Sequence, residues 1–226
     1  LQIEPRPMNG WEPIEDGLVS GEIDGALIPV PLAIHLISQG LAIRIIMFVH
    51  RAGSMIIASN KLSGETIDEF KNRSVLTPSE LSVEAMLLHR FLASASMSIG
   101  FHGMPETDVA GESVPPPVME EMLLLDTDKD IAGASMPEPF ASLAVRSGTA
   151  RKLCTTSSLW KDHPGSVFVL SDSVADNRPE ETDALITGFI DAAARLHNGP
   201  DPDTELFSLL AELIEQFHQF QLSGFL

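Results

Sequence analysis

The run Ile23-Asp-Gly-Ala-Leu-Ile-Pro-Val30 is the clearest secondary-structure signal in the chain. Its centre is continuously apolar and has the length of a strand, which is typical of a strand buried on both faces in a parallel sheet. Leu32–Ser38 follows as a predicted helix that stops at Gly40, a residue suited to end a helix. Two further β-rich runs, Ile43–Val49 and Ser54–Ser59, come next. This alternation predicts an α/β fold of mostly parallel sheets covered by helices.

The same alternation extends in both directions along the chain. Toward the N-terminus the pattern predicts a short strand and then a helix, over Leu1–Glu4 and Ile14–Ser20. Downstream, apolar periodicity and turn residues predict further elements of both kinds. Helices are expected after Thr77, through Leu92 and fading at Gly100, and over Val118–Leu125, Phe140–Ser147, Pro179–His197 and Thr204–Gln221. Strands are expected over Thr107–Val114, Ile131–Met136 and Ser166–Leu170.

The segment Thr77-Pro-Ser-Glu80 predicts a helix start. Thr77 is a good N-cap, Pro78 suits the first helical position, and Glu80 is placed to close a capping box. Free N–H groups and the positive end of the helix dipole at such a start attract anions. Ordinary capping explains the same residues, so both interpretations stay open at this point.

Composition excludes several classes of protein. The 226 residues carry 32 Asp and Glu against 14 Lys and Arg, a formal net charge of −18, which argues against a nucleic-acid partner. A hydrophobic content of 44% predicts a globular domain with a core. The single cysteine, Cys154, excludes an intramolecular disulfide. The longest apolar stretches, Ala26–Ile37 and Leu41–Val49, fall short of the roughly 20 residues that a membrane-spanning helix needs.

No motif in the chain predicts catalysis or a cofactor. Glycine-rich phosphate loops, nucleophile elbows and zinc-binding helix motifs are all missing from the sequence, and the seven histidines have no ligand-type spacing. Asp126-Thr-Asp-Lys-Asp130 resembles the opening of a calcium loop, but Ile131 stands where that loop needs glycine. We therefore expect a solvated connector there, and neither a metal site nor a cofactor. The protein is predicted not to be an enzyme.

Several short motifs, in their order along the chain, resemble the nitrate/sulfonate/bicarbonate substrate-binding proteins of ABC importers. They are Gly10-Trp-Glu-Pro-Ile, Gly21-Glu-Ile-Asp-Gly-Ala, Pro31-Leu-Ala, Pro78-Ser-Glu-Leu-Ser-Val with Leu87-Leu-His89, Val114-Pro-Pro-Pro with Met119, Glu138-Pro-Phe140 and Ser158-Leu-Trp-Lys-Asp-His-Pro164. The resemblance implies a two-lobed periplasmic binding protein of type II, with a ligand cleft between the lobes. It also implies an extracytoplasmic protein that delivers a small anionic or sulfonate-like solute to an importer.

The resemblance suggests how the lobes divide the chain. Residues 1–59 and 171–226 are expected to form lobe I, and 76–170 lobe II, with hinge crossings at 60–75 and about 170–172. In this family a strand and a helix precede the position that is here Leu1. We therefore expect that a segment before Leu1, or another segment, completes the sheet of lobe I.

The matching positions nominate the residues that bind the solute. Thr77 and Ser79 are expected to donate hydrogen bonds to an anionic group, and Trp11 and Phe140 to form apolar walls. Glu138 is repulsive to an anion unless it is protonated or paired, so it selects a ligand with a donor group or a bound metal, or is structural. The full expected set is Asn9, Gly10, Trp11, Pro29, Val30, His50, Ser54, Thr77, Ser79, Glu138 and Phe140.

The partners implied are a small-molecule solute and the membrane permease of an ABC importer, with the protein itself a monomer. The start Leu1-Gln-Ile-Glu-Pro is not a secretion signal, so the resemblance places a processed protein in the periplasm or on a lipid anchor. Two alternatives stay open. One is an enzyme on the same scaffold, of the pyrimidine-precursor or menaquinone-pathway type, and the other is a ligand-sensing domain.

Overall fold

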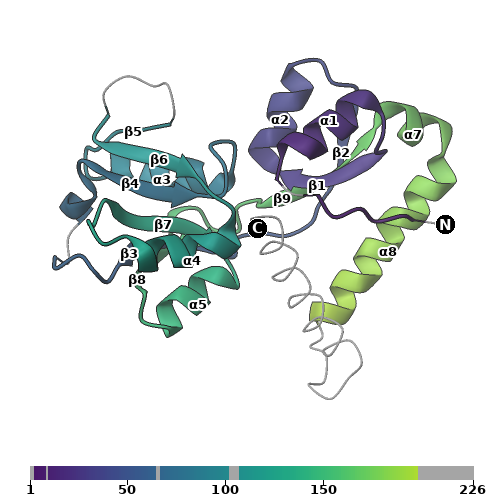
Figure 1. Cartoon of the computed structure of the whole chain (residues 1–226). Helices are drawn as coiled ribbons and strands as arrows, with labels where there is room; N and C mark the ends of the chain where they lie inside the picture. Colours follow the sequence, from purple (N-terminus) through teal and green to yellow (C-terminus); the bar gives the residue numbers. More distant parts are fainter. Residues whose placement is uncertain (1–2, 9, 65–66, 102–106, 198–226) are drawn as a thin grey trace. The chain divides into compact units, whose positions relative to one another are not determined.

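The computed structural model describes residues 3–8, 10–64, 67–101 and 107–197 (Figure 1). The chain divides into two compact units. One consists of Leu1–Ala26, Gly40–Met47 and Phe168–Leu226, and the other of Leu27–Gln39 and Phe48–Val167. Asn9 and the predicted helix Thr204–Gln221 lie outside the described residues. Helices and strands alternate along the chain, which confirms the predicted α/β class.

The elements have the following bounds. The strands are β1 Gly25–Pro29, β2 Ile43–Phe48, β3 Ser54–Ser59, β4 Arg73–Thr77, β5 Ile99–Gly100, β6 Val109–Ser113, β7 Ile131–Pro137, β8 Ala150–Thr155 and β9 Ser166–Ser171. The helices are α1 Glu12–Ser20, α2 Val30–Ser38, the 3-10 helix η1 Ile67–Phe70, α3 Val83–Ala93, α4 Pro116–Leu125, α5 Phe140–Arg146, α6 Thr156–Leu159, α7 Asp172–Asn177 and α8 Pro179–His197.

The larger sheet has six strands in the order β5-β6-β4-β7-β3-β8 (Figure 1). β5, β6, β4 and β7 are mutually parallel. β3 is antiparallel to both β7 and β8, so β8 points the same way as the parallel strands. Five of these six strands therefore share one direction, which confirms the prediction of a mostly parallel sheet.

Helices cover both faces of this sheet. On one face, α3 packs Leu88 and Leu92 with Ile56 and Val75. On the other face, α4 and α5 contribute Met119, Leu123, Ala141 and Ala144, which pack with Ile57, Leu76 and Ala134. Neighbouring residues such as Ile56 and Ile57 are both fully buried because successive side chains of a strand point to opposite faces. Each such burial contributes about 1.5–3 kcal/mol, so this sheet has a core on either side.

Gly133 permits a close approach of two strands in the middle of the sheet. It pairs with Ala58 across the β3–β7 register. A Cβ atom at this position would lie 2.0 Å from the carbonyl oxygen of Ile57, well inside van der Waals contact. Only a residue without a side chain fits there, which explains a glycine in an otherwise apolar strand.

The smaller sheet has the order β1-β9-β2. Ser171 N–H donates to the Asp24 carbonyl at one end of the β1–β9 pair, and Val30 N–H donates to the Gly165 carbonyl at the other. These opposed positions make β9 antiparallel to β1, and the equivalent bonds of Val49 to Ser166 and of Asp172 to Ala42 make it antiparallel to β2. Neighbouring strands of this small sheet are therefore antiparallel, because β9 lies between β1 and β2.

The structure corrects further predictions about individual elements. Ile3 and Glu4 form no strand, against the strand predicted over Leu1–Glu4. β3 was expected in the first lobe, but it pairs with β7 and β8 in the larger sheet. β8 was not predicted at all, because its Arg151 and Lys152 give it the polarity of a loop. Charged residues are common in a strand at a sheet edge, which is where β8 lies.

Long-range polar contacts attach α7 to the smaller sheet. Arg44 in β2 donates from Nε to Asp172 at 2.7 Å and from both terminal nitrogens to Asp176, at 2.9 and 3.1 Å. These carboxylates hold the pKa of Arg44 above its ordinary value. In the same unit the Phe168 ring lies 5.3 Å from that of Phe189 in α8. Among the described residues, no helix combines the length and apolarity that crossing a membrane would require.

Candidate functional site

The carboxyl ends of the parallel strands of the larger sheet meet at one edge. β4 ends at Thr77 and β7 ends at Pro137, and these strands are paired in parallel. Ser54, the first residue of the reversed strand β3, pairs with Pro137, so it lies at the same edge. Ligands of open α/β sheets bind at this edge. It is therefore the place to look for a solute site within this unit.

Backbone contacts of Gly165 bring together Val30 and His50, two of the residues nominated from the sequence. Gly165 N–H donates to the His50 carbonyl at 3.1 Å, and the Gly165 carbonyl accepts from Val30 N–H at 3.2 Å. A Cβ atom on Gly165 would lie 2.3 Å from His50 Nε2, so the imidazole packs directly over the glycine. Pro29, which precedes Val30, is buried. The structure thus brings Pro29, Val30 and His50 together. The sequence analysis nominated these three residues, but it could not show that they are neighbours.

His50 is the titratable group of this arrangement. Partial burial lowers its pKa below the ordinary value, and the positive charge of a protonated His163 would lower it further. The carboxylate of Glu84 acts in the opposite direction, which places Glu84 within electrostatic reach of His50. At neutral pH the imidazole is therefore uncharged, and it does not supply the positive charge that an anion site would use.

Glu84 is a polar group that the sequence analysis missed. It lies in the first turn of α3, and its Oε1 accepts a 2.7 Å hydrogen bond from the hydroxyl of Ser54. The Ser135 hydroxyl donates to the backbone carbonyl of Glu84 at 3.1 Å. Ser54 and Ser135 are buried, whereas Glu84 is half-buried. An acid two residues after Ser82, at the start of a helix, was the available signal, since acidic residues favour the first turn.

A chain of hydrogen bonds continues from Ser54 to a buried histidine. The Thr156 hydroxyl donates to the Ser54 carbonyl at 3.0 Å, and His163 Nε2 lies 2.8 Å from the same hydroxyl oxygen. Thr156 and His163 are almost completely buried. The contacts join β3, α6 and the loop after α6, so they fix the start of β3 against its neighbours.

The helix predicted at Thr77 starts later than the sequence indicated. Thr77 is the last residue of β4, and α3 begins at Val83, with the Ser82 hydroxyl accepting from Ala85 N–H at 3.1 Å. Residues 79–82 instead form a turn closed by Ser82 N–H and the Ser79 carbonyl. A Thr-Pro-Ser sequence suits a turn as well as a helix start. The burial of Val83, the first helical residue, is consistent with the later start.

Glu138 lies at the same edge, but its carboxylate contacts the following helix. Its backbone N–H donates to the Gly53 carbonyl at 2.8 Å, next to Ser54. Oε2 accepts from Ser142 N–H at 3.0 Å and Oε1 from the Ser142 hydroxyl at 2.8 Å. These bonds satisfy the start of α5, where Phe140 is half-buried as the first residue. The structural alternative for Glu138 thus has direct support, and its contact with a solute stays a prediction.

The remaining nominated residues belong to the other compact unit. Gly10 is exposed and has a φ of +92°, and Trp11 is half-buried at the start of α1. The Trp11 carbonyl accepts from Glu15 N–H at 2.9 Å and so begins the helix. Their roles toward a solute stay predictions.

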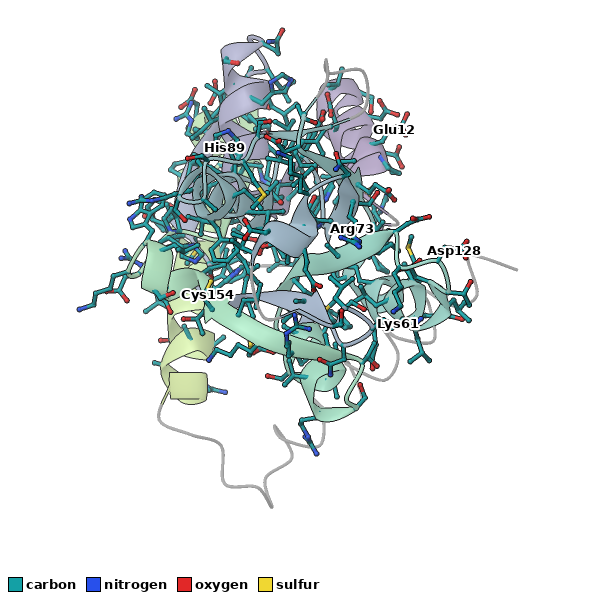
Figure 2. The ribbon with its side chains drawn as sticks, turned by 90° about the vertical axis from the view of Figure 1, so that its left-hand side faces the viewer. Glu12, Lys61, Arg73, His89, Asp128 and Cys154 are labelled. Carbon is teal, nitrogen blue, oxygen red and sulfur yellow. The ribbon has the colours of Figure 1, made fainter. Side chains whose placement is uncertain are left out.

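The connector between α4 and β7 is held by hydrogen bonds between two side chains and its backbone. Asp126 accepts at Oδ1 from Asp130 N–H and at Oδ2 from Ile131 N–H. Lys61 donates to the Leu124 and Asp126 carbonyls, each at 2.6 Å (Figure 2, which labels Lys61, Arg73 and Asp128 in this part of the molecule). The carboxylate that would open a calcium loop therefore holds the turn. Within the described residues, His, Cys, Asp and Glu nowhere gather in a metal-holding group.

Sequence comparisons relate most of the chain to a known family. Residues 1–214 match the model of the NMT1-like family. The chain is 29% identical over 208 residues to the nitrate import ATP-binding protein NrtC of Synechococcus elongatus, a match that covers 85% of this chain and 30% of that protein. It is 26% identical to the bicarbonate transport ATP-binding protein CmpC of Synechocystis sp., over 89% of this chain and 31% of that one. The chain spans about a third of these relatives.

Two solved structures with the same fold are named as binding components. The periplasmic nitrate-binding protein NrtA from Synechocystis PCC 6803 matches with a TM-score of 0.69 and 24% identity, over 82% of this chain and 51% of that one. The ligand-binding component of an ABC-type import system from Staphylococcus aureus matches with a TM-score of 0.68 and 22% identity, over 80% and 60%. At such identities the likeness shows that the chain has the periplasmic binding protein fold.

Proposed function

The chain belongs to the NMT1-like family, and from this premise we propose that it binds a small solute for an ABC-type importer and catalyses no reaction. The observation that carries the proposal is the family match over residues 1–214, together with the fold shared with binding proteins. The polar edge of the larger sheet supports it, because it gathers hydrogen-bonding side chains at the edge where ligands of open α/β sheets bind.

We place the solute of this unit at that edge, next to Val30, His50, Ser54, Thr77 and Ser79. Glu138 and Phe140 border the same edge. The partner of the loaded protein is the membrane permease of an importer, and its place of action is outside the cytoplasm. Light scattering tests the further proposal that the protein is a monomer.

Calorimetric titration tests the binding function directly. The panel is nitrate, bicarbonate, ethanesulfonate, taurine and pyrimidine compounds, each added to the purified chain. We expect saturable binding of at least one solute, with that solute recovered unchanged after incubation. If no solute binds, or if the bound solute is converted to a product, the proposal fails.

A ligand-sensing domain is a second candidate, and one observation favours it. The relatives NrtC and CmpC are named as ATP-binding proteins, and the matching segment makes up only about a third of each. A segment of this kind within a transport ATPase would sense the solute instead of delivering it. The gene that surrounds this segment distinguishes the sensing function from the delivery function. A reading frame continuous with an ATP-binding module indicates sensing, whereas a secretion signal or lipobox indicates delivery.

A further inference from the structure

Hydroxyl groups at the edge of the larger sheet donate their protons within the protein. A hydroxyl has one proton to give, so each donation removes one donor from the set open to a ligand. Ser54 donates to the Glu84 carboxylate, and Thr156 donates to the Ser54 carbonyl. Three more hydroxyls donate to backbone carbonyls of this region, those of Thr77, Ser82 and Ser135. Five hydroxyls that could have bound an anion are thereby committed.

The same region keeps a strong acceptor. Among the described residues, the Glu84 carboxylate receives a side-chain hydrogen bond only from Ser54, at Oε1. Glu84 is half-buried, so its carboxylate retains contact with the solvent that a solute would displace. Glu138, the other carboxylate at this edge, differs because both of its oxygens accept from Ser142. Glu84 is therefore the carboxylate with acceptor capacity left for a ligand.

We infer that Glu84 determines the specificity of the site, by accepting a hydrogen bond from solutes that carry an ammonium, amidine or amino N–H group. This inference rests on the proposed binding function and narrows its solute class. An oxyanion without such a donor meets a carboxylate of like charge and finds five of the nearby hydroxyl protons committed. A solute with an N–H donor meets an acceptor that Ser54 holds in place, and a charge-assisted bond is among the stronger hydrogen bonds.

Charge around Glu84 favours the same class of solute. His50, the nearby imidazole, is uncharged at neutral pH because partial burial disfavours its protonated form. Arg51, the residue after His50, is the next cation along the chain. Its guanidinium carbon lies 5.8 Å from the centre of the Phe48 ring, so this cation lies against Phe48 in a cation–π arrangement. The partner that Glu84 does have is the neutral hydroxyl of Ser54. Its charge is thus available to an incoming cation or N–H group.

Matched solutes measure this preference. Taurine and ethanesulfonate share a sulfonate and differ by one ammonium group, and guanidinium and nitrate are both planar and trigonal but differ in charge and in donor capacity. Titrations use the full chain at about 0.15 M salt, where long-range charge effects are screened. We expect taurine to bind about 10 to 100 times more tightly than ethanesulfonate, and guanidinium more tightly than nitrate, as a hydrogen bond to a charged group implies.

Two variants assign the preference to its source. Glu84→Gln keeps the size of the side chain but removes the charge, so we expect it to abolish the preference for the ammonium partner. Glu80→Gln is the matched control. Glu80 is exposed and precedes the same helix, and its substitution removes an equal charge from the protein. It should leave the preference unchanged. The melting temperature without ligand verifies that both variants are folded.

The outcomes separate this inference from the function on which it rests. Equal or tighter binding of ethanesulfonate or nitrate by the wild-type chain overturns the inference and leaves the binding function standing. A preference that survives in Glu84→Gln also overturns it. Any other solute of the wider panel that binds is sorted by the same criterion, the presence of an N–H donor. If no solute binds at all, the proposed function fails and the inference fails with it.

Discussion

Gly133 lies where β7 and β3 approach so closely that a side chain has no room. We predict that Gly133→Ala lowers the free energy of unfolding by about 3 kcal/mol or more, because the Ile57 backbone has to move. Gly188→Ala is the matched control in α8, where an added Cβ meets nothing within 4 Å. There the better helix propensity of alanine should raise stability by about 0.5–1 kcal/mol. Urea denaturation measures both, and a neutral Gly133→Ala contradicts the β3–β7 register.

His50 makes stability depend on pH in a defined direction. Because burial lowers its pKa in the folded protein, the unfolded chain binds the proton more readily. The contribution of neutral His50 is therefore present above the unfolded pKa of about 6.5 and is lost as pH falls through the lower folded value. We expect the wild-type melting temperature to fall more than that of His50→Gln between pH 7.5 and pH 5.5. Parallel curves for the two proteins would refute this role.

The carboxylates of Glu84 and Glu138 show what residue type alone can and cannot predict. Both are acids near the start of a helix, and only Glu138 was nominated from the sequence. In the structure Glu138 bonds Ser142 in the helix that follows it, whereas Glu84 bonds Ser54, 30 residues away. The local contact could be foreseen from spacing. The distant one depends on how β3 lies against α3.

At the level of elements, the start of α3 is the sharpest difference between expectation and structure. Ser82 caps this helix, accepting from Ala85 N–H and donating to the Ser79 carbonyl. We predict that Ser82→Ala destabilises the protein by about 1 kcal/mol, the usual effect of losing an N-cap. Ser79→Ala removes one acceptor, for Leu81 N–H, and should cost less than half as much. Denaturant unfolding of the two variants compares them, and a larger effect at Ser79 argues for the earlier helix start.

Most of the described elements could be predicted because their signals are local. β3 coincides with the predicted run Ser54–Ser59, and α8 coincides with Pro179–His197. β8 and α7 were missed because polar or short segments lack a clear apolar period. The neighbours of each strand could not be predicted either. An apolar run specifies a buried strand, but it does not specify which sheet that strand joins.

On the scale of the whole molecule, the two compact units each contain one tryptophan, Trp11 in the first and Trp160 in the second. Variants with a single tryptophan, made by Trp11→Phe or Trp160→Phe, therefore report on one unit each. We predict that Gly133→Ala shifts the unfolding midpoint reported by Trp160 more than the midpoint reported by Trp11, because Gly133 lies in the second unit. Fluorescence during urea unfolding measures both midpoints. Equal shifts would show that the units unfold together as one cooperative structure.

The amino-acid sequence by itself determined the α/β class, most helices and strands, and the family to which the chain is similar. These depend on apolar periodicity, turn residues and motif order, which are properties of neighbouring residues. Tertiary structure alone decided that β9 lies between β1 and β2, and that Ser54 meets both Glu84 and Thr156, the latter 102 residues away. The reason is physical, because strand pairing joins segments whose complementarity is visible only once both are folded. The candidate site depends on those long-range contacts.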